Sequence, residues 1–193
     1  MVLAYEEINR KTRAKIQRAL LTNLESKPLD KISVGDIAAA AGISRGTFYL
    51  HYLDKYDLIE QTEQTFLEGL HNHLHPVVPK NLLEEAAKGR TSEAAVNIFC
   101  YIDQEQKIFK TLLKSGIGFH KKLKIFFIDY FEDKMTINED FFKNAHVSPE
   151  YLSAFATSAF LGLIETWIEG GLSETPEEMA ETYLKIIFFI KNL

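Results

Sequence analysis

The stretch AAAAGISRGTFYLHYLDK, residues 38–55, decides the fold of this chain. Its run of alanines favours a helix that packs closely against its neighbours, and Gly42 stands where such a helix would end in the left-handed conformation. Ser44 then has a side chain suited to cap a second helix. The pattern predicts a helix, a short turn that contains glycine, and another helix over residues 33–52.

The helix before the turn has its own start signal. Ser33 is a good N-cap, and Asp36, three residues later, completes a shortened capping box. Apolar residues then recur at helical spacing and define one buried face: Val34, Ile37, Ala38 and Ala41.

The helix after the turn has two different faces. Phe48 and Tyr52 are four residues apart and are expected to anchor it from behind, whereas Arg45 lies on another side. An arginine in the first turn can donate two hydrogen bonds to a guanine or bind a phosphate, and Gly46 permits a close approach. Four other side chains can donate to phosphate oxygens: Thr47, Tyr49, His51 and Lys55. The alternative is an amphipathic helix whose polar face is merely solvated.

Charge is distributed unevenly along the chain. The net charge is −5 over 193 residues, yet residues 1–55 hold nine Lys and Arg against six Asp and Glu. The remainder holds 13 Lys and Arg against 21 Asp and Glu. A basic N-terminal part joined to an acidic body predicts that only the first part contacts a polyanion.

The sequence from residue 33 onward also follows the pattern of a known family. It has, in order, Ile-Ala at 37–38, Ala-Gly-Ile-Ser at 41–44, Phe-Tyr at 48–49, His-Tyr at 51–52 and a lysine at 55. In these positions the chain resembles the DNA-binding domain of the TetR family of transcriptional regulators. The resemblance implies double-stranded DNA as the partner and DNA contacts from Ser33, Gly35, Ser44, Arg45, Gly46, Thr47, Tyr49, Leu50, His51 and Lys55.

Two of these positions depart from the usual pattern of the family. Gly35 stands where a basic or polar side chain often contacts DNA, and Leu50 stands where a polar or aromatic side chain is common. Leu50 can instead contact a thymine methyl group. Both departures concern which operator sequence is recognised rather than whether DNA is bound.

Hydrophobic periodicity is helical along nearly the whole chain, with no convincing strand alternation. The expected fold is therefore all-α with about nine helices in total. A three-helix DNA-binding domain with the helix-turn-helix is expected over residues 1–53, and a larger helical ligand-binding and dimerisation domain over residues 54–193. Outside the turn region, helices are expected at 6–25, 54–74, 82–88, 92–105, 107–114, 117–134, 149–169 and 176–192, with a loop over 136–147.

The last two helices are the candidate interface of a homodimer. Small residues recur every four positions at Ala154, Ser158 and Gly162, which allows another helix to come close, and the final helix is apolar over more than one core-facing stripe. The alternative is a helix buried inside its own subunit. The expected interface residues are Ala154, Phe155, Ser158, Gly162, Tyr183 and Ile187.

The body is rich in aromatic residues, with 14 phenylalanines in the chain. The family resemblance implies a ligand cavity among these helices, although aromatic residues at helical spacing are most often plain core. The residues expected to line it are Phe66, Leu70, Phe99, Ile102, Phe119, Phe127, Phe160 and Trp167. The resulting hypothesis is a dimeric repressor that a small-molecule effector releases from a palindromic operator.

Other functions are weighed against this hypothesis. A regulator of the same fold could answer to a protein partner or to no small ligand. An enzyme is disfavoured because the sequence has no Gly-rich phosphate loop, no HExxH pair and no Cys/His nucleophile pairing, so no cofactor and no catalytic residue is expected. His71 and His75 share a helix face while His73 points away, and a solvated or interface cluster is favoured over a metal site.

Neither a signal peptide nor a membrane span is expected. The first ten residues carry two glutamates and no small-residue cleavage site, and the longest apolar stretches are far shorter than the roughly 20 residues of a membrane span. Cys100 is the only cysteine and lies in an apolar run, so a buried hydrophobic role is favoured over redox sensing. These features predict a cytoplasmic protein without membrane contact.

Overall fold

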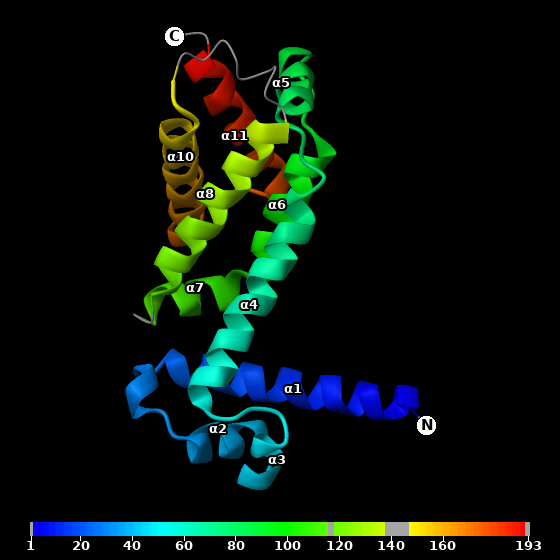
Figure 1. The fold of residues 1–193 in the computed structure, drawn as a ribbon, viewed down its shortest axis with the longest axis vertical. Helices are drawn as coiled ribbons and strands as arrows, with labels where there is room; N and C mark the ends of the chain where they lie inside the picture. The colour runs from blue at the N-terminus through cyan, green and yellow to red at the C-terminus, as the bar shows by residue number, and fades with distance from the viewer. Residues whose placement is uncertain (1, 116–117, 138–146, 192–193) are drawn as a thin grey trace. The chain divides into compact units, whose positions relative to one another are not determined.

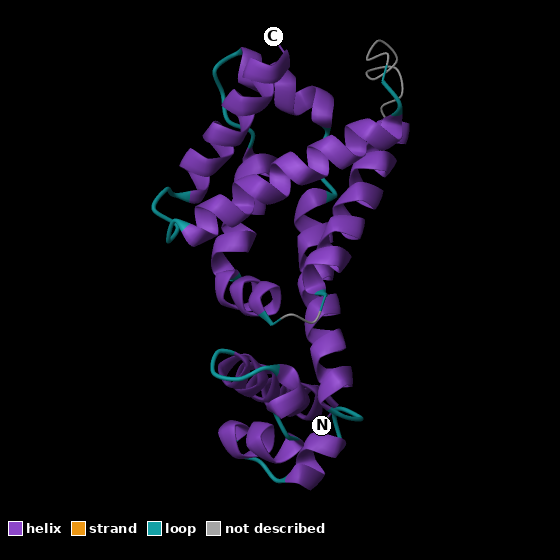
Figure 2. Cartoon of the chain, turned by 90° about the vertical axis from the view of Figure 1, so that its left-hand side faces the viewer, coloured by secondary structure: helices purple, strands orange, loops and turns teal. Residues whose placement is uncertain are grey.

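The computed structural model describes residues 2–115, 118–137 and 147–191 (Figure 1). Within these ranges the regular structure is helical, and Figure 2 contains no strand colour. The all-α fold class predicted from the sequence is confirmed. The loop expected over residues 136–147 falls mainly on residues 138–146, which lie outside the described ranges.

The N-terminal part consists of α1 (Val2–Leu24), a short 3-10 helix (Leu29–Lys31), α2 (Val34–Ala41) and α3 (Arg45–Tyr49). The helix-turn-helix predicted for residues 33–52 is confirmed as α2, turn and α3. Helix α1 begins earlier than expected, at Val2 rather than near residue 6. The helix α4 (Lys55–Leu74) then follows.

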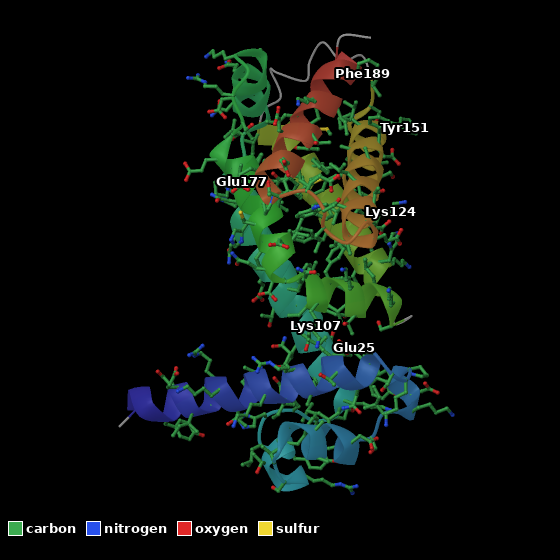
Figure 3. All side chains as sticks on the ribbon, turned by 180° about the vertical axis from the view of Figure 1, so that it is seen from behind. Glu25, Lys107, Lys124, Tyr151, Glu177 and Phe189 are labelled. Atoms are coloured by element: carbon green, nitrogen blue, oxygen red, sulfur yellow. The ribbon has the colours of Figure 1, made fainter. Side chains whose placement is uncertain are left out.

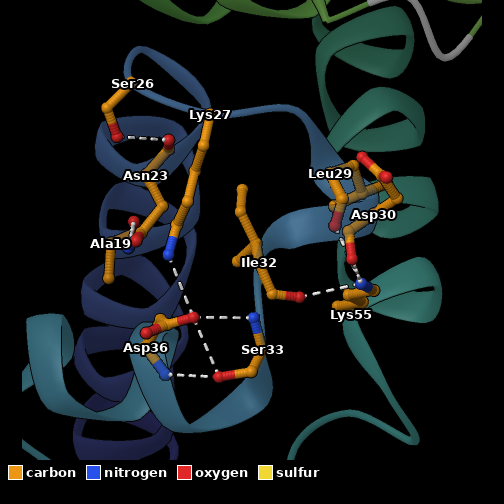
Figure 4. A network of polar contacts seen from close by, with 10 residues as sticks. All are labelled: Ala19, Asn23, Ser26, Lys27, Leu29, Asp30, Ile32, Ser33, Asp36 and Lys55. Atoms are coloured by element: carbon orange, nitrogen blue, oxygen red, sulfur yellow. Dashed lines mark hydrogen bonds and ion pairs between the residues drawn. The ribbon is translucent and has the colours of Figure 1, made fainter.

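The predicted helix ends around the turn are all present. The Ser33 hydroxyl accepts the Asp36 N–H at 3.1 Å, and the Asp36 carboxylate accepts the Ser33 N–H at 2.8 Å, which completes the capping box (Figure 4). Gly42 ends α2 with φ +67°, in the left-handed region. Ser44 begins α3 because its hydroxyl accepts the Thr47 N–H at 3.0 Å. Local chemistry therefore fixes the length of both helices and the turn between them.

The second part of the chain is built from longer helices. They are α5 (Pro79–Ala87), α6 (Glu93–Gln104), α7 (Gln106–Lys114), α8 (Phe119–Ile137), α10 (Pro149–Glu169) and α11 (Pro176–Lys191). Each corresponds to a predicted segment within a few residues. The start of α11 is a capping box in which the Thr175 N–H donates to the Glu178 carboxylate at 2.8 Å.

The chain forms two compact units rather than one. The first comprises Met1–Phe66 and Ile108–Phe119, and the second comprises Leu67–Lys107 and His120–Leu193. The first unit therefore includes the start of α4 and most of α7 in addition to the helix-turn-helix. The functional boundary placed after residue 53 remains a prediction.

Each unit has its own apolar core. In the first unit, five side chains are completely inaccessible to solvent: Ile16, Leu20, Ile37, Phe48 and Leu58. In the second unit, α11 packs against α5 and α6. Aromatic rings from four helices meet there, with Phe99 of α6 lying 5.7 Å from Trp167 of α10 between ring centroids. Phe160 of α10 lies 5.1 Å from Phe127 of α8 and 5.2 Å from Tyr183 of α11.

Among the described helices, α10 alone is long and apolar enough to cross a membrane by length and composition. Part of it, 39% of the apolar window, is buried inside the protein. Core helices of water-soluble proteins pass the same test, so this property is weak evidence for a membrane span.

Candidate nucleic-acid interface

The N-terminus of α3 presents free backbone amides together with a cationic side chain. Ser44 and Thr47 satisfy each other through a 2.9 Å hydroxyl contact, and both keep capacity for a further hydrogen bond. Arg45 and Gly46 follow directly and are exposed. The positive end of a helix dipole next to an exposed guanidinium is a favourable place for an anion.

The two predicted faces of α3 are confirmed. Phe48 is fully buried and Tyr52 is 5% exposed, so both anchor the helix from behind. Their ring centroids lie 5.8 Å apart. Tyr49 and Leu50 are instead 57% and 82% exposed. An exposed leucine next to an exposed tyrosine leaves apolar surface available on the same side as the polar groups.

Gly35 and Arg45 lie against each other across the turn. A methyl group placed on Gly35 would be 2.4 Å from Nη2 of Arg45 and 3.1 Å from its Cζ. The Arg45 guanidinium therefore rests on the backbone of α2 at a position where any side chain would displace it. From the sequence, Gly35 is expected at a DNA-contact position where the usual side chain is missing. Its contact with Arg45 joins two helices, and no local motif indicates it.

The placement of Lys55 differs from the phosphate contact expected of it. Its Nζ donates to the carbonyl oxygens of Leu29 and Ile32, both at 2.8 Å, and to that of Asp30 at 3.1 Å (Figure 4). An ammonium group has three donors, and three carbonyls accept them. A phosphate contact from Lys55 would have to replace at least one of these bonds.

A network that the sequence did not reveal supports the start of α4. Arg13 of α1 lies over the Tyr52 ring at 4.9 Å from its centroid and also donates to the Gln61 side-chain oxygen. Gln61 donates to Asp57 at 2.8 Å, and Asp57 accepts the Leu53 N–H at 2.8 Å. The network ties α1 and α4 to the loop after α3. It joins residues far apart in sequence, so no local motif indicated it.

Burial and the nearby Arg13 charge lower the pKa of His51 from its usual 6.5. Burial contributes most, because it penalises the charged imidazolium. His51 is therefore neutral at pH 7 and retains one N–H for donation. It can serve as the phosphate donor predicted for it without carrying a charge.

Several cations of the basic N-terminal part are already paired. Glu7 binds Arg10 and Lys11 at 2.9 and 3.2 Å, and Lys27 binds Asp36 at 3.1 Å. The Ser33 backbone N–H and this lysine hold the pKa of Asp36 down to about 2. Across the part of the chain that the structure describes, no carboxylate pairs with Lys15, Arg18 or Arg45. Arg45 is the one of these three on the helix-turn-helix itself.

Comparison with known proteins places this architecture in a family. The model of the tetR family of bacterial regulatory proteins matches residues 18–62, and a model described as a transcriptional regulator C-terminal region matches residues 89–188, more than half of the chain. The chain belongs to the TetR family. It is therefore a DNA-binding transcriptional regulator and not an enzyme.

Individual bacterial regulators match over nearly the whole chain. The HTH-type transcriptional regulator YvdT of Bacillus subtilis is 25% identical over 92% of this chain and 92% of its own length. The regulator YxbF of the same organism is 22% identical over 90% of this chain, which spans only 44% of YxbF. The crystal structure of NalD, the secondary repressor of the MexAB-OprM multidrug efflux pump in Pseudomonas aeruginosa, superimposes with a TM-score of 0.67 at 21% identity, covering 94% of this chain and 96% of NalD.

The side chains expected to line a ligand cavity in this TetR-family body are all buried, but they fall into two groups. Phe66 and Phe119 belong to the first unit, where their ring centroids lie 5.8 Å apart and both lie near Phe109. The other six belong to the second unit: Leu70, Phe99, Ile102, Phe127, Phe160 and Trp167. Their role in binding a ligand remains a prediction.

The residues expected at the dimer interface separate into outward and inward positions. Phe155 is 59% exposed, Ser158 is exposed, and a methyl group on Gly162 would meet no atom within 4 Å. Ala154 and Ile187 are half-buried. Tyr183 points inward instead, against Phe160, and burial raises its pKa to about 12. The apolar stripe of α11 did not reveal which face its tyrosine occupies.

Two further aromatic residues of these helices are exposed. Tyr151 of α10 is 70% exposed and Phe189 of α11 is 65% exposed, and Figure 3 shows both at the same end of the second unit. Neither residue is predicted from the sequence, because a helical stripe does not show which of two apolar faces is left uncovered.

The histidine cluster has a structural explanation. The His73 ring stacks on Tyr101 at 4.6 Å, and its Nδ1 lies 2.8 Å from the Gly69 carbonyl oxygen. His71 and His75 share the opposite side, 5.8 Å apart between ring centroids. The described residues contain no group of three or more metal-binding side chains.

Two further side chains of the second unit have clear surroundings. Glu165 pairs with His120 at 3.1 Å on a partly exposed surface. Cys100 is half-buried, and burial together with Glu177 and Asp103 raises the pKa of its thiol. A raised thiol pKa disfavours the reactive thiolate, in line with the structural role favoured for Cys100.

Proposed function

We propose that the chain acts as a homodimeric, cytoplasmic repressor that binds a palindromic operator through α3 and is released by a small-molecule ligand. The observation that carries the DNA part is the exposed face of α3, where Arg45 pairs with no carboxylate among the described residues and lies beside the exposed Gly46, Tyr49 and Leu50. Phosphate groups would dock at the helix N-terminus and a base edge at the guanidinium.

The dimer part rests on the uncovered face of α10. Phe155, Ser158 and the open space at Gly162 form a stripe at helical spacing on the outside of the second unit. A stripe of this kind suits a second copy of the same helix related by a two-fold axis. Two helix-turn-helix units would then meet half-sites about one helical turn of DNA, or a multiple of it, apart.

Fluorescence anisotropy with a palindromic fragment from the chain's own promoter region tests the DNA part. Affinity should fall steeply between low and moderate salt because phosphate neutralisation releases counterions. Arg45→Ala should cost about 1–3 kcal/mol if Arg45 recognises a guanine, and should relax the preference at one base pair per half-site. An operator affinity that does not change with salt concentration would exclude the DNA proposal. An unchanged base preference in Arg45→Ala would mean that Arg45 contacts only a phosphate.

The ligand part rests on the aromatic-rich interior of the second unit, where rings from α6, α8, α10 and α11 meet. A ligand that favours the non-binding arrangement of the two DNA-binding units would act with a coupling of about 1–3 kcal/mol. A thermal-shift screen tests this, because a molecule that binds the folded state raises the unfolding midpoint. Hits should also weaken operator binding.

A second candidate is the same regulator controlled by a protein partner or by no small ligand. It is favoured by the close packing of the same rings, whose centroids lie 5.1–6.2 Å apart and fill one another's space. A broad screen without a single stabilising compound, together with intact operator binding, would support this candidate.

A further inference from the structure

Gly35 is the second residue of α2, and the Arg45 side chain lies directly on it. A Cβ at position 35 would approach Arg45 to 2.4 Å at Nη2, 3.0 Å at Nε and 3.1 Å at Cζ. Real Cβ atoms essentially never lie as close as this one would to Nη2, and the other two contacts are tight, so the guanidinium occupies space that glycine leaves open. The two residues belong to different helices on either side of the turn.

The Arg45 guanidinium lies on the α2 backbone while its donors are still available. An arginine side chain loses rotamer freedom when it is fixed, so a preformed position lowers the cost of using it for recognition. Within the described ranges no carboxylate pairs with Arg45, and the nearby Asp36 is already engaged by Ser33 and Lys27. The guanidinium is thus placed without being neutralised.

From this geometry we infer that Gly35 is a positioning residue for base recognition, which acts by admitting the Arg45 guanidinium onto the α2 backbone. The inference rests on the proposed function. It assigns recognition of one guanine per half-site to this single guanidinium, because Gly35 has no side chain of its own to contribute. A side chain at position 35 would move Arg45 away from the guanine edge.

Gly35→Ala is a selective probe of this inference. The atoms it would meet belong to the far end of a flexible side chain, so Arg45 shifts and the backbone of α2 does not have to. Alanine also favours the helix relative to glycine, so thermal stability should be kept or raised. Operator affinity should nevertheless fall roughly tenfold, as expected for loss of a bidentate guanine contact.

The operator supplies a readout that a merely structural role would not move. Replacing the recognised guanine by 7-deazaguanine removes the N7 acceptor alone. The wild-type protein should discriminate against this base several-fold, whereas Gly35→Ala and Arg45→Lys should discriminate little. Equal discrimination by wild type and Gly35→Ala would overturn the inference.

A double-mutant cycle separates action through Arg45 from a direct approach of Gly35 to DNA. Gly35→Ala should have no further effect in the Arg45→Ala background. The matched control is Gly46→Ala, because a methyl group there would meet only Ser44 Oγ at 3.6 Å and leave Arg45 in place. Any loss of operator affinity caused by Gly46→Ala should be the same in the Arg45→Ala background.

The outcomes distinguish the two levels of the proposal. If the wild-type protein fails to bind any operator fragment, the proposed function is wrong. If the wild-type protein binds and Gly35→Ala costs the same factor with and without Arg45, the proposed function stands and the positioning role of Gly35 is wrong.

Discussion

The Nζ atom of Lys55 lies 2.8 Å from the carbonyl oxygen of Ile32. The same ammonium donates to Leu29 and Asp30, so the first residue of α4 holds the segment that leads into α2 (Figure 4). Helix α4 is thereby attached to the helix-turn-helix by a charge-assisted contact to backbone groups, independent of any side chain on that segment.

Lys55→Met should lower the stability of the protein more than it alters its electrostatics toward DNA. Loss of the three bonds should cost roughly 1–3 kcal/mol in urea unfolding, because two partly buried carbonyls and one exposed carbonyl lose a charged donor. The salt slope of operator binding should change by much less than the value of about 1 expected for a lost phosphate contact. Lys31→Met is the control, since Lys31 is exposed and pairs only weakly with Asp30 at 3.8 Å. If Lys55→Met instead changes the salt slope by about 1 and leaves the stability unaltered, Lys55 contacts a phosphate.

Gly42→Ala should destabilise the protein by about 1 kcal/mol. The cost is conformational, because φ at Gly42 is +67° and a methyl group there would meet no atom within 4 Å. Gly42→Asn should cost less, since asparagine tolerates the left-handed region better than alanine. The thermal unfolding midpoint of Gly42→Asn should therefore be higher than that of Gly42→Ala. Equal midpoints would contradict a conformational origin of the destabilisation.

The accuracy of the sequence predictions followed the sequence separation of the interacting groups. Ser33 with Asp36, Ser44 with Thr47, and the left-handed Gly42 involve neighbours within one turn, so residue type and spacing predict them. Three relations that shape the interface join separate segments of the chain: Gly35 with Arg45, Lys55 with Ile32, and Arg13 with Tyr52. The local sequence of one segment does not indicate the distance to a residue on another.

The same limit explains why the packing of Tyr183 against Phe160 was not predicted, and its place in a dimer interface stays a prediction. Helix α11 is apolar over a wide arc, and periodicity alone does not say which part faces the core. In the structure Tyr183 lies 5.2 Å from Phe160 between ring centroids, while Phe189 remains exposed. Only the packing partners of α11 decide between these faces.

Folding stability should depend on pH through His51. Its folded pKa lies below the usual 6.5, so the unfolded state binds the proton more tightly. The contribution of neutral His51 to the free energy of unfolding is fully present above pH 6.5. It is lost as the pH falls through 6.5 toward the lower pKa of the folded state. His51→Gln should flatten this part of a stability profile measured by urea unfolding.

Removing the positive charge of Arg13 should raise the pKa of His51. An NMR titration of the His51 ring protons should give a higher pKa in Arg13→Gln than in the wild type, because the Arg13 charge opposes protonation. Arg10→Gln provides the control on the same helix, since Arg10 is paired with Glu7 at 2.9 Å. If the His51 pKa is unchanged in Arg13→Gln, burial alone lowers it.

Gly162→Leu should dissociate the proposed dimer. Within one protomer a side chain at position 162 enters open space, so the fold of the variant should be intact by circular dichroism. Between protomers a leucine would hold the two copies of α10 apart, because a close helix approach requires small residues at the contact. Sedimentation should then give half the wild-type mass. Gly162→Ala is the matched control and should remain dimeric, since a methyl group adds helix propensity but little bulk. A dimeric Gly162→Leu protein of normal affinity would place the interface on another face, with Tyr151 and Phe189 as the next residues to replace.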